Sequence, residues 1–285
     1  MVRIDLHTHS VVSDGTDTPA DLVGKAAAAG LDVVALTDHD TTAGWDEAVA
    51  ALPSGLRLVR GMEMSCEGRG DDGDPVAVHL LAYLFDPSES GFVAERARLR
   101  DERVSRIRTM ALRMAEDGLP IDPDAVLDRA GPSVGRPHLA QALVEAGVVS
   151  SIGDAFTELL STRSRYYVPK ADTPLADAVQ MVRAAGGVAV VAHPLARSRG
   201  RVMALGQIEE LAALGLAGIE VAHPDHGADD VRVLTDLASS LDLVVTGSSD
   251  YHGDNKRIGL GEFTTAPAAF EALVDRASGT EVVAG

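Results

Sequence analysis

Two histidines stand two residues apart near the start of the chain, in the segment DLHTHS at residues 5–10. Apolar and polar residues alternate over residues 2–6 before them, which is the period-two pattern of a short strand. Residues two apart in an extended chain point to the same side, so the imidazoles of His7 and His9 can reach one point in space. Imidazole is the commonest nitrogen ligand of divalent metals, so the pair predicts one arm of a metal site.

Further residues of ligand type recur at or near the ends of the other predicted strands. They are His39 in TDHD, Glu63, His79, His193, His223, and Asp250 with His252. Asp14 lies just beyond the first strand and can join them. The carboxyl ends of the strands of a parallel β/α barrel converge on one rim, so we expect these side chains to surround one site. One such histidine alone would indicate a core or loop residue, but their repetition favours a metal centre.

The elements that must position these residues alternate along most of the chain. Short apolar strands are expected at residues 2–6, 31–36, 56–65, 76–85, 188–192, 216–221 and 243–246. Helices are expected at residues 19–29, with Thr18 as the N-cap, and at 42–52, 173–185, 204–214, 229–240 and 267–276. Strands that alternate with helices predict an α/β fold with a parallel sheet, and this many units favour a closed barrel.

The pattern changes between residues 86 and 170, where helices are expected at 92–115, 122–129, 137–146 and 152–160. We interpret this stretch as a helical cap inserted into a barrel domain made of residues 1–85 and 171–285. Its first helix carries the arginines Arg96, Arg98, Arg100, Arg103, Arg106 and Arg108 among acidic residues. We expect this to be a solvated helix face rather than an RNA-binding track.

The motifs DLHTHS, TDHD, AHP and GSSDYHG, in this order, make the whole chain resemble the PHP (polymerase and histidinol phosphatase) family of metal-dependent phosphoesterases. The resemblance implies a distorted (β/α)7 barrel that binds two or three divalent ions, with manganese favoured over zinc or iron. It also implies three groups of ligands: His7, His9, Glu63 and Asp250; Glu63, His79 and His193; and Asp14, His39 and His252.

The expected chemistry follows from such ions. They would carry more positive charge than the three carboxylates carry negative charge, so the site suits a phosphate anion. A metal-bound hydroxide would be the nucleophile, and no nucleophilic serine or cysteine is required. His223 or His226, in the segment HPDH, is the candidate for a phosphate contact or a general acid. Asp5 and Asp38 precede ligands, and we expect each to accept the free ring N–H of a ligand histidine.

The insertion supplies a second cluster, in the segments GRPH and YVPK. An arginine at the start of a helix can hold a phosphate, although a surface salt bridge for Arg136 and a capping role for His138 are equally open from the residues alone. These segments resemble PHP enzymes that remove the 3′-phosphate of nucleoside 3′,5′-bisphosphates or degrade short RNA from its 5′ end. The resemblance therefore implies Arg136, His138 and Lys170 as substrate contacts, with Tyr166 a weaker candidate.

The composition of the chain limits the classes of binding partner that we expect. The formal charge is −18, from 25 basic and 43 acidic residues, which argues against a surface that binds duplex DNA. There is one cysteine, no signal peptide and no apolar run long enough to span a membrane, so we expect a cytoplasmic protein. Two alternatives stay open, a histidinol-phosphate phosphatase and a non-catalytic metal-binding module. The oligomeric state is not predicted.

Overall fold

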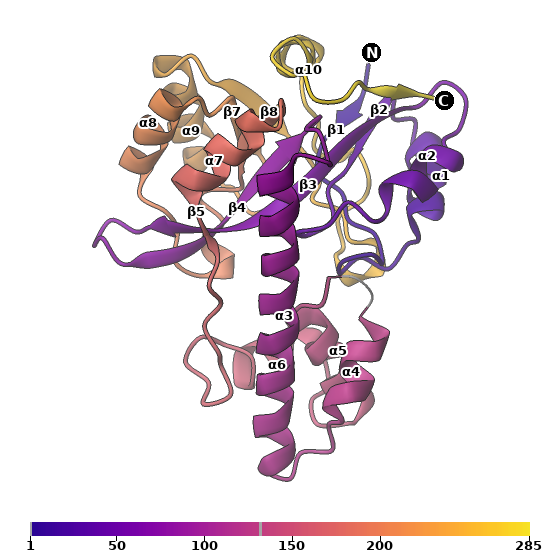
Figure 1. Cartoon of the computed structure of the whole chain (residues 1–285), viewed down its shortest axis with the longest axis vertical. Helices are drawn as coiled ribbons and strands as arrows, with labels where there is room; N and C mark the ends of the chain where they lie inside the picture. The colour runs from indigo at the N-terminus through magenta and orange to yellow at the C-terminus, as the bar shows by residue number, and fades with distance from the viewer. Residues whose placement is uncertain (1, 131–132) are drawn as a thin grey trace.

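The computed structural model describes residues 2–130 and 133–285. A sheet flanked by helices forms its upper part in Figure 1, and a group of helices lies below it. The strands are β1 (Ile4–Asp5), β2 (Val33–Leu36), β3 (Arg57–Arg69), β4 (Pro75–Tyr83), β5 (Thr173–Pro174), β6 (Val188–Ala192), β7 (Gly218–Ala222), β8 (Val244–Gly247) and β9 (Val283–Ala284). Their order is β1-β2-β3-β4-β6-β7-β8, with β5 and β9 paired to β3.

The two ends of this sheet meet at the first and last of the predicted metal-binding motifs. Thr8 and Tyr251 form a parallel bridge, and the His9 N–H donates to the Tyr251 carbonyl over 2.8 Å. These contacts nearly close the sheet into a ring. The predicted distorted β/α barrel is therefore confirmed.

The expectation of a parallel sheet is wrong for β4 and for β9, the latter a short strand antiparallel to β3. β4 runs antiparallel to both of its neighbours, β3 and β6. Only residues 70–74 connect β3 to β4, and a parallel pair needs a crossover of about a dozen residues or more. β3 also continues six residues beyond Glu63, so this carboxylate lies mid-strand and not at a strand end.

Helices α1 (Pro19–Ala28), α2 (Trp45–Ala50), α7 (Leu175–Ala184), α8 (Leu205–Leu214), α9 (Ala228–Ser240) and α10 (Pro267–Val274) surround the sheet. Short 3₁₀ turns, η1 (Arg197–Arg199) and η2 (Gly253–Asn255), follow β6 and β8. The predicted start of α1 is confirmed, since Thr18 Oγ1 accepts the Asp21 N–H over 3.0 Å. α7 begins two residues later than expected because Thr173 and Pro174 pair with β3.

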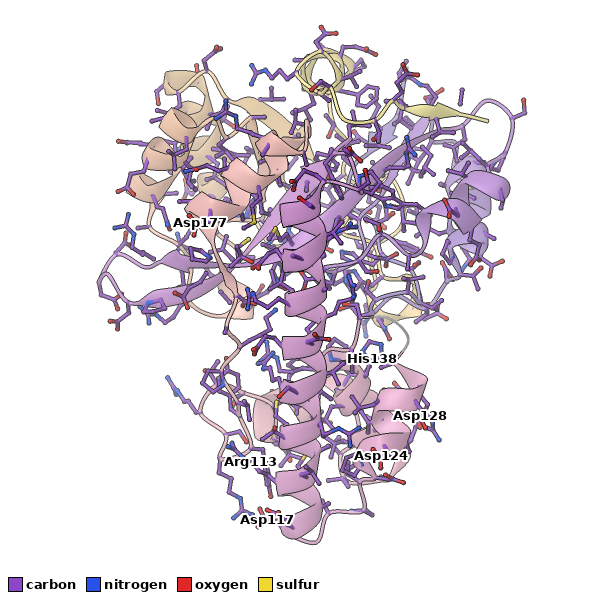
Figure 2. The ribbon with its side chains drawn as sticks, in the orientation of Figure 1. Arg113, Asp117, Asp124, Asp128, His138 and Asp177 are labelled. Carbon is purple, nitrogen blue, oxygen red and sulfur yellow. The ribbon has the colours of Figure 1, made fainter. Side chains whose placement is uncertain are left out.

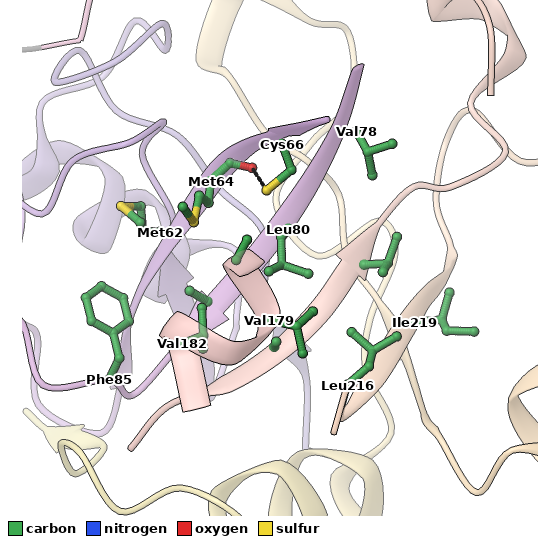
Figure 3. Packing of buried hydrophobic residues seen from close by; sticks show 14 of the residues in the cluster. Met62, Met64, Cys66, Val78, Leu80, Phe85, Val179, Val182, Leu216 and Ile219 are labelled. Atoms are coloured by element: carbon green, nitrogen blue, oxygen red, sulfur yellow. Dashed lines mark hydrogen bonds between the residues drawn. The ribbon is translucent and has the colours of Figure 1, made fainter. Parts of the chain in front are cut away.

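The sheet has apolar side chains on both faces, as a barrel requires. Within β2, Val33 and Ala35 belong to the cluster inside the barrel, while Val34 and Leu36 belong to the cluster beneath the helices. This alternation follows from the two-residue period of a strand. Figure 3 shows the outer cluster, where Val179 and Val182 of α7 lie among residues of β3 and β4.

The lower part consists of α3 (Ser90–Glu116), α4 (Pro123–Arg129), α5 (Arg136–Glu145) and α6 (Ile152–Glu158). α3 is shared, because Phe92 and Leu99 pack in the barrel's outer cluster while Ile107 and Met110 pack in a separate cluster among the lower helices (Figure 1). We call α3–α6 the cap; its status as an independent domain stays a prediction. Within the residues described, no helix combines the length and apolarity needed to cross a membrane.

Candidate metal centre and cap cavity

The first group of predicted ligands lies where the chain leaves β1 and β8. The Nε2 atoms of His7 and His9 are 3.1 Å apart. Glu63 Oε2 lies 3.3 and 3.1 Å from them, and Asp250 Oδ1 lies 3.4 and 3.5 Å from them. Two nitrogen ligands at about 2.1 Å from one ion would stand about 3.0–3.4 Å apart. The atoms of this group are therefore spaced as ligands of a single ion are.

Glu63 offers its second oxygen to a different pair of histidines. Its Oε1 lies 2.7 Å from His79 Nδ1 and 3.0 Å from His193 Nε2. Because Ser65 pairs with His79 in the β3–β4 register, Glu63 and His79 are diagonal neighbours on one face of the sheet. The antiparallel course of β4, and not a parallel strand end, brings His79 to the rim.

A third group surrounds Asp14, in the loop after β1. Asp14 Oδ1 lies 3.3 Å from His252 Nε2 and 3.6 Å from His9 Nδ1, and its Oδ2 lies 3.6 Å from His39 Nε2. The other ring nitrogen of His39 lies 3.1 Å from Glu63 Oε2. All nine predicted ligands are thus brought together in three adjoining groups; their role as ligands stays a proposal.

Three buried atoms of these groups have no hydrogen-bond partner among the described residues: His39 Nδ1, His79 Nδ1 and Asp250 Oδ1. Each unpaired buried polar atom costs about 1–3 kcal/mol, so three in one place indicate a further binding partner. Imidazoles mixed with carboxylates suit manganese, iron and zinc. These residues therefore fit bound divalent ions.

Backbone strain concentrates at the same place. The φ angles of Asp40, His193 and Asp250 are 54°, 28° and 52°. Side chains other than glycine seldom adopt the left-handed region, and each such residue costs about 1–3 kcal/mol. Two of the three are predicted ligands and the third follows His39, so local stability is lost where ligands are positioned.

Burial and neighbouring charges divide the histidines into two classes. Burial lowers the pKa of His193 to about 3, and it also lowers the pKa values of His39 and His252. Burial also opposes protonation of His9, but the nearby carboxylates of Asp250 and Glu63 outweigh it and raise its pKa to about 9. Neutral rings offer a lone pair directly, while at His9 a metal ion must displace a proton.

Glu220 is a residue of the site that the sequence reasoning missed. This fully buried carboxylate in β7 lies 3.1 Å from His7 Nδ1 through Oε1 and accepts the His193 backbone N–H over 2.9 Å through Oε2. Proximity to His7 and His223 outweighs burial and lowers its pKa to about 2. A carboxylate inside the apolar strand GIEVA was the available signal.

The roles expected for Asp5 and Asp38 need a correction, because both side chains contact groups other than histidine rings. Asp5 accepts from the backbone N–H and hydroxyl of Ser249. Asp38 accepts from Ser10 and from the Ser13 hydroxyl, whose oxygen lies 3.3 Å from His9 Nδ1. Asp5 and Asp38 fix the loops that carry ligands, and Glu220 takes the place expected for them.

The contacts of His223 and His226 lie partly within the chain itself. His223 is buried, its Nδ1 accepts the Asp225 N–H over 3.0 Å, and its Nε2 lies 3.3 Å from Asp250 Oδ2. Both ring nitrogens of His226 contact backbone, namely the Leu195 N–H at 3.2 Å and the Val221 carbonyl at 2.8 Å. Both ring nitrogens of each residue thus have a polar neighbour, and a role of either residue as a phosphate contact or general acid stays a prediction.

A cavity of about 540 Å³ separates the predicted ligands from the cap. Asp14, His39, His79 and His252 form part of its wall on the barrel side. The rest of the wall contains acidic, apolar and aromatic residues together with six basic side chains: Arg103, Arg106, Arg136, Lys170, Arg199 and Lys256. Arg199 was not predicted, and it and Lys256 both donate to Asp250 Oδ2. A metal site and a basic wall thus share one cavity, which can accommodate an anionic substrate.

The α3 arginines are not a uniformly solvated face, which corrects the sequence-based expectation. Arg96 and Arg103 are buried, with 6% and 9% of their surface exposed. Arg103 donates through Nε to Asp40 and through Nη2 to the Ser65 hydroxyl over 2.7 Å. Arg98 and Arg108 behave as expected and pair with acidic side chains near the surface.

Of the predicted cap contacts, the cavity wall contains Arg136 and Lys170 but not His138. His138 Nδ1 accepts the Gly135 N–H over 3.1 Å, which is the capping role left open above. Figure 2 shows His138 at the junction between the cap and the barrel. Tyr166 is buried in the cap core, and its neighbour Tyr167 lines the cavity instead.

Comparisons with known proteins agree with this geometry. A family model described as the PHP domain matches residues 5–119. A 5′-3′ exoribonuclease from Haemophilus influenzae is 34% identical over 256 residues, which cover 88% of this chain and 90% of that protein. A 3′,5′-nucleoside bisphosphate phosphatase from Chromobacterium violaceum is also 34% identical over 256 residues, which cover 88% of each chain.

A crystal structure from Bifidobacterium adolescentis, described as a metal-dependent phosphoesterase, superposes with a TM-score of 0.88. It shares 38% sequence identity, and the match covers 96% of both chains. The fold, the clustered ligands and these relatives together make this protein a hydrolase of phosphoric esters that uses divalent metal ions. The chain belongs to the PHP family.

Proposed function

We propose that the enzyme removes a terminal phosphate from nucleotides, either as a nucleoside 3′,5′-bisphosphate phosphatase or as a 5′-3′ exonuclease on short RNA. The observation that carries this proposal is the shared cavity, with the ligand groups on one wall and basic cap residues on the other. Relatives with these two activities match 88% of the chain, which supports a nucleotide substrate.

The nine predicted ligands would hold two or three ions, and we propose manganese as the native metal. When bound, such ions lower the pKa of a water, which can then lose a proton and attack phosphorus, and the ions also neutralise charge on the phosphate. Glu63 would belong to two ion sites at once, because its two oxygens face different histidines.

The chain's own part is to bind and orient the substrate. Arg136 and Lys170 face the cavity from the cap and can donate to phosphate oxygens. Glu220 holds the proton of His7 on Nδ1 and so leaves Nε2 directed at Glu63 and Asp250. We do not assign the general acid, because both ring nitrogens of His223 and of His226 have a polar neighbour within the chain.

The test is incubation of the purified protein with manganese and one of three substrates. These are adenosine 3′,5′-bisphosphate, a short 5′-phosphorylated RNA, and histidinol phosphate, with products identified by chromatography. Release of phosphate from the bisphosphate or of mononucleotides from RNA is expected. Turnover of histidinol phosphate alone would replace the proposal by the first alternative. No turnover with confirmed bound metal would favour a non-catalytic module.

A further inference from the structure

Two arginines of the cap share one part of the cavity wall without a carboxylate partner. Arg106 comes from α3, and Arg136 is the first residue of α5. Arg106 donates through Nε to the Val168 carbonyl over 2.7 Å, and Arg136 donates through Nη1 to the Leu160 carbonyl over 3.1 Å. In the described part of the chain, the η nitrogens of Arg106 have no hydrogen-bond acceptor.

Two neighbouring basic residues of the same cavity already have a carboxylate partner. Arg103 is paired with Asp40, and Lys170 is paired with Asp172 at 2.8 Å. Asp172 also attracts Arg106, but from beyond ion-pair distance. Burial, and next the charge of Arg136, lowers the pKa of Arg106 to about 10. Two partly buried guanidinium groups therefore repel each other here, and an anion between them would relieve the repulsion.

One aromatic ring joins the two arginines. The guanidinium carbons of Arg106 and Arg136 lie 5.2 and 5.9 Å from the centre of the Tyr167 ring. Arg136 also lies 5.4 Å from the Phe156 ring, and both rings line the cavity. Contact with ring faces holds the planar groups in place while leaving N–H donors at their edges.

This pair lies further from the barrel than the residues beside the ligand groups. Arg103 contacts Asp40, the residue after His39. Arg106 follows Arg103 on α3 by three residues, just under one turn, or about 4.5 Å along the axis. A phosphate at the barrel wall and an anion at Arg106 would thus occupy separate parts of one cavity.

We propose that Arg106 and Arg136 form a second anion subsite, which holds a phosphate that is not hydrolysed while another phosphate of the same nucleotide lies at the metal centre. This inference rests on the proposed nucleotide function and narrows it to substrates with two phosphate groups. Arg106 is then a specificity-determining residue, and Tyr167 fixes its orientation.

The test compares adenosine 3′,5′-bisphosphate with adenosine 3′-monophosphate, using the manganese-loaded enzyme. In Arg106→Gln, the ratio of kcat/KM for the bisphosphate to that for the monophosphate should fall on the order of 10- to 100-fold, as expected for a lost charge-assisted contact. Arg106→Lys should give an intermediate ratio and guards against misfolding. Arg108→Gln is the matched control, because Arg108 is on the same helix but pairs with Asp124, and its ratio should equal that of the native enzyme.

A second readout measures binding of adenosine 5′-monophosphate and of adenosine by calorimetry. Arg106→Gln should weaken binding of the monophosphate on the order of tenfold or more and change adenosine binding far less. An unchanged ratio with unchanged binding would overturn the subsite and leave the proposed function intact. A native enzyme that binds the monophosphate through Arg106 but hydrolyses neither nucleotide would refute the proposed function and not the subsite.

Discussion

Replacing Glu220 by glutamine would test how the site prepares its ligands. The change keeps the size of the side chain and removes its charge. The His193 backbone N–H can only donate, so it requires the amide oxygen on its side. The amide NH₂ would then face His7 Nδ1 and force the proton of that ring onto Nε2. Nε2 is the nitrogen directed at Glu63 and Asp250, so His7 would lose its ligand form.

The expected magnitude follows from these two contacts. Hydrogen bonds to a charged group contribute about 1.5–3 kcal/mol each, and this one is fully buried. Loss of a partner that orients a ligand histidine commonly weakens metal binding about 10- to 100-fold, or about 1.4–2.7 kcal/mol. The two figures agree, so we expect a loss of affinity for manganese in this range.

The assay is titration of metal-free protein with manganese by calorimetry, at one pH, for the native chain, Glu220→Gln and Glu209→Gln. Glu209 lies exposed on α8, so its variant carries the same chemical change away from the site and should bind like the native chain. Circular dichroism reports whether the metal-free variants fold. Native affinity in a folded Glu220→Gln protein would refute the assignment of His7 as a ligand oriented by Glu220.

Three further predictions concern the same cavity. Asp250→Ala should abolish manganese-dependent phosphate release and lower the metal content measured by elemental analysis; normal turnover with full metal content would remove it from the ligands. Arg136→Ala should raise the KM for adenosine 3′,5′-bisphosphate about tenfold with metal content retained, while Arg129→Ala, on the exposed side of the cap, should leave KM unchanged. Burial, and next Arg103, lowers the pKa of Lys170 to about 8, so its charge is present below that pH and lost above it. KM should therefore rise as the pH passes 8, and Lys170→Arg should flatten that rise because guanidinium stays charged; an identical profile in this variant would exclude Lys170 as the cause.

The sequence predicted which side chains meet at the rim because the spacing of several of them is local. His7 and His9, or Asp250 and His252, stand two residues apart after a strand, and strand ends of a barrel meet at one rim. His79 was also among the predicted ligands, but as a residue at or near a strand end. It reaches Glu63 from the middle of an antiparallel strand, by cross-strand register. β4 runs antiparallel because only a short connection joins it to β3. The hydrophobic periodicity of a segment predicts a strand but not the direction of that strand.

The side chains that contact the predicted ligands were harder to predict, because only the folded structure determines which of them meet. Asp38 and Glu220 are both carboxylates beside strands that carry histidines, yet only Glu220 contacts a ring nitrogen. The difference lies in which side chain points into the barrel, and in β7 the inward position is Glu220, between two residues of the outer apolar cluster. In the cap, charge alternation on α3 predicted a solvated face, but it could not reveal that Arg103 is buried against Asp40.

Arg103 contacts both walls of the cavity. It donates to Asp40, next to His39, and to Ser65, two residues beyond Glu63. Its Nη1 lies 3.5 Å from the carbonyl of Val134, in the segment that leads into Arg136. A buried ion pair contributes little net stability unless its remaining hydrogen-bond donors are also satisfied. The remaining donors of Arg103 contact Ser65 on the barrel side and Val134 on the cap side. Arg103 therefore helps to set the position of Arg136 relative to His39.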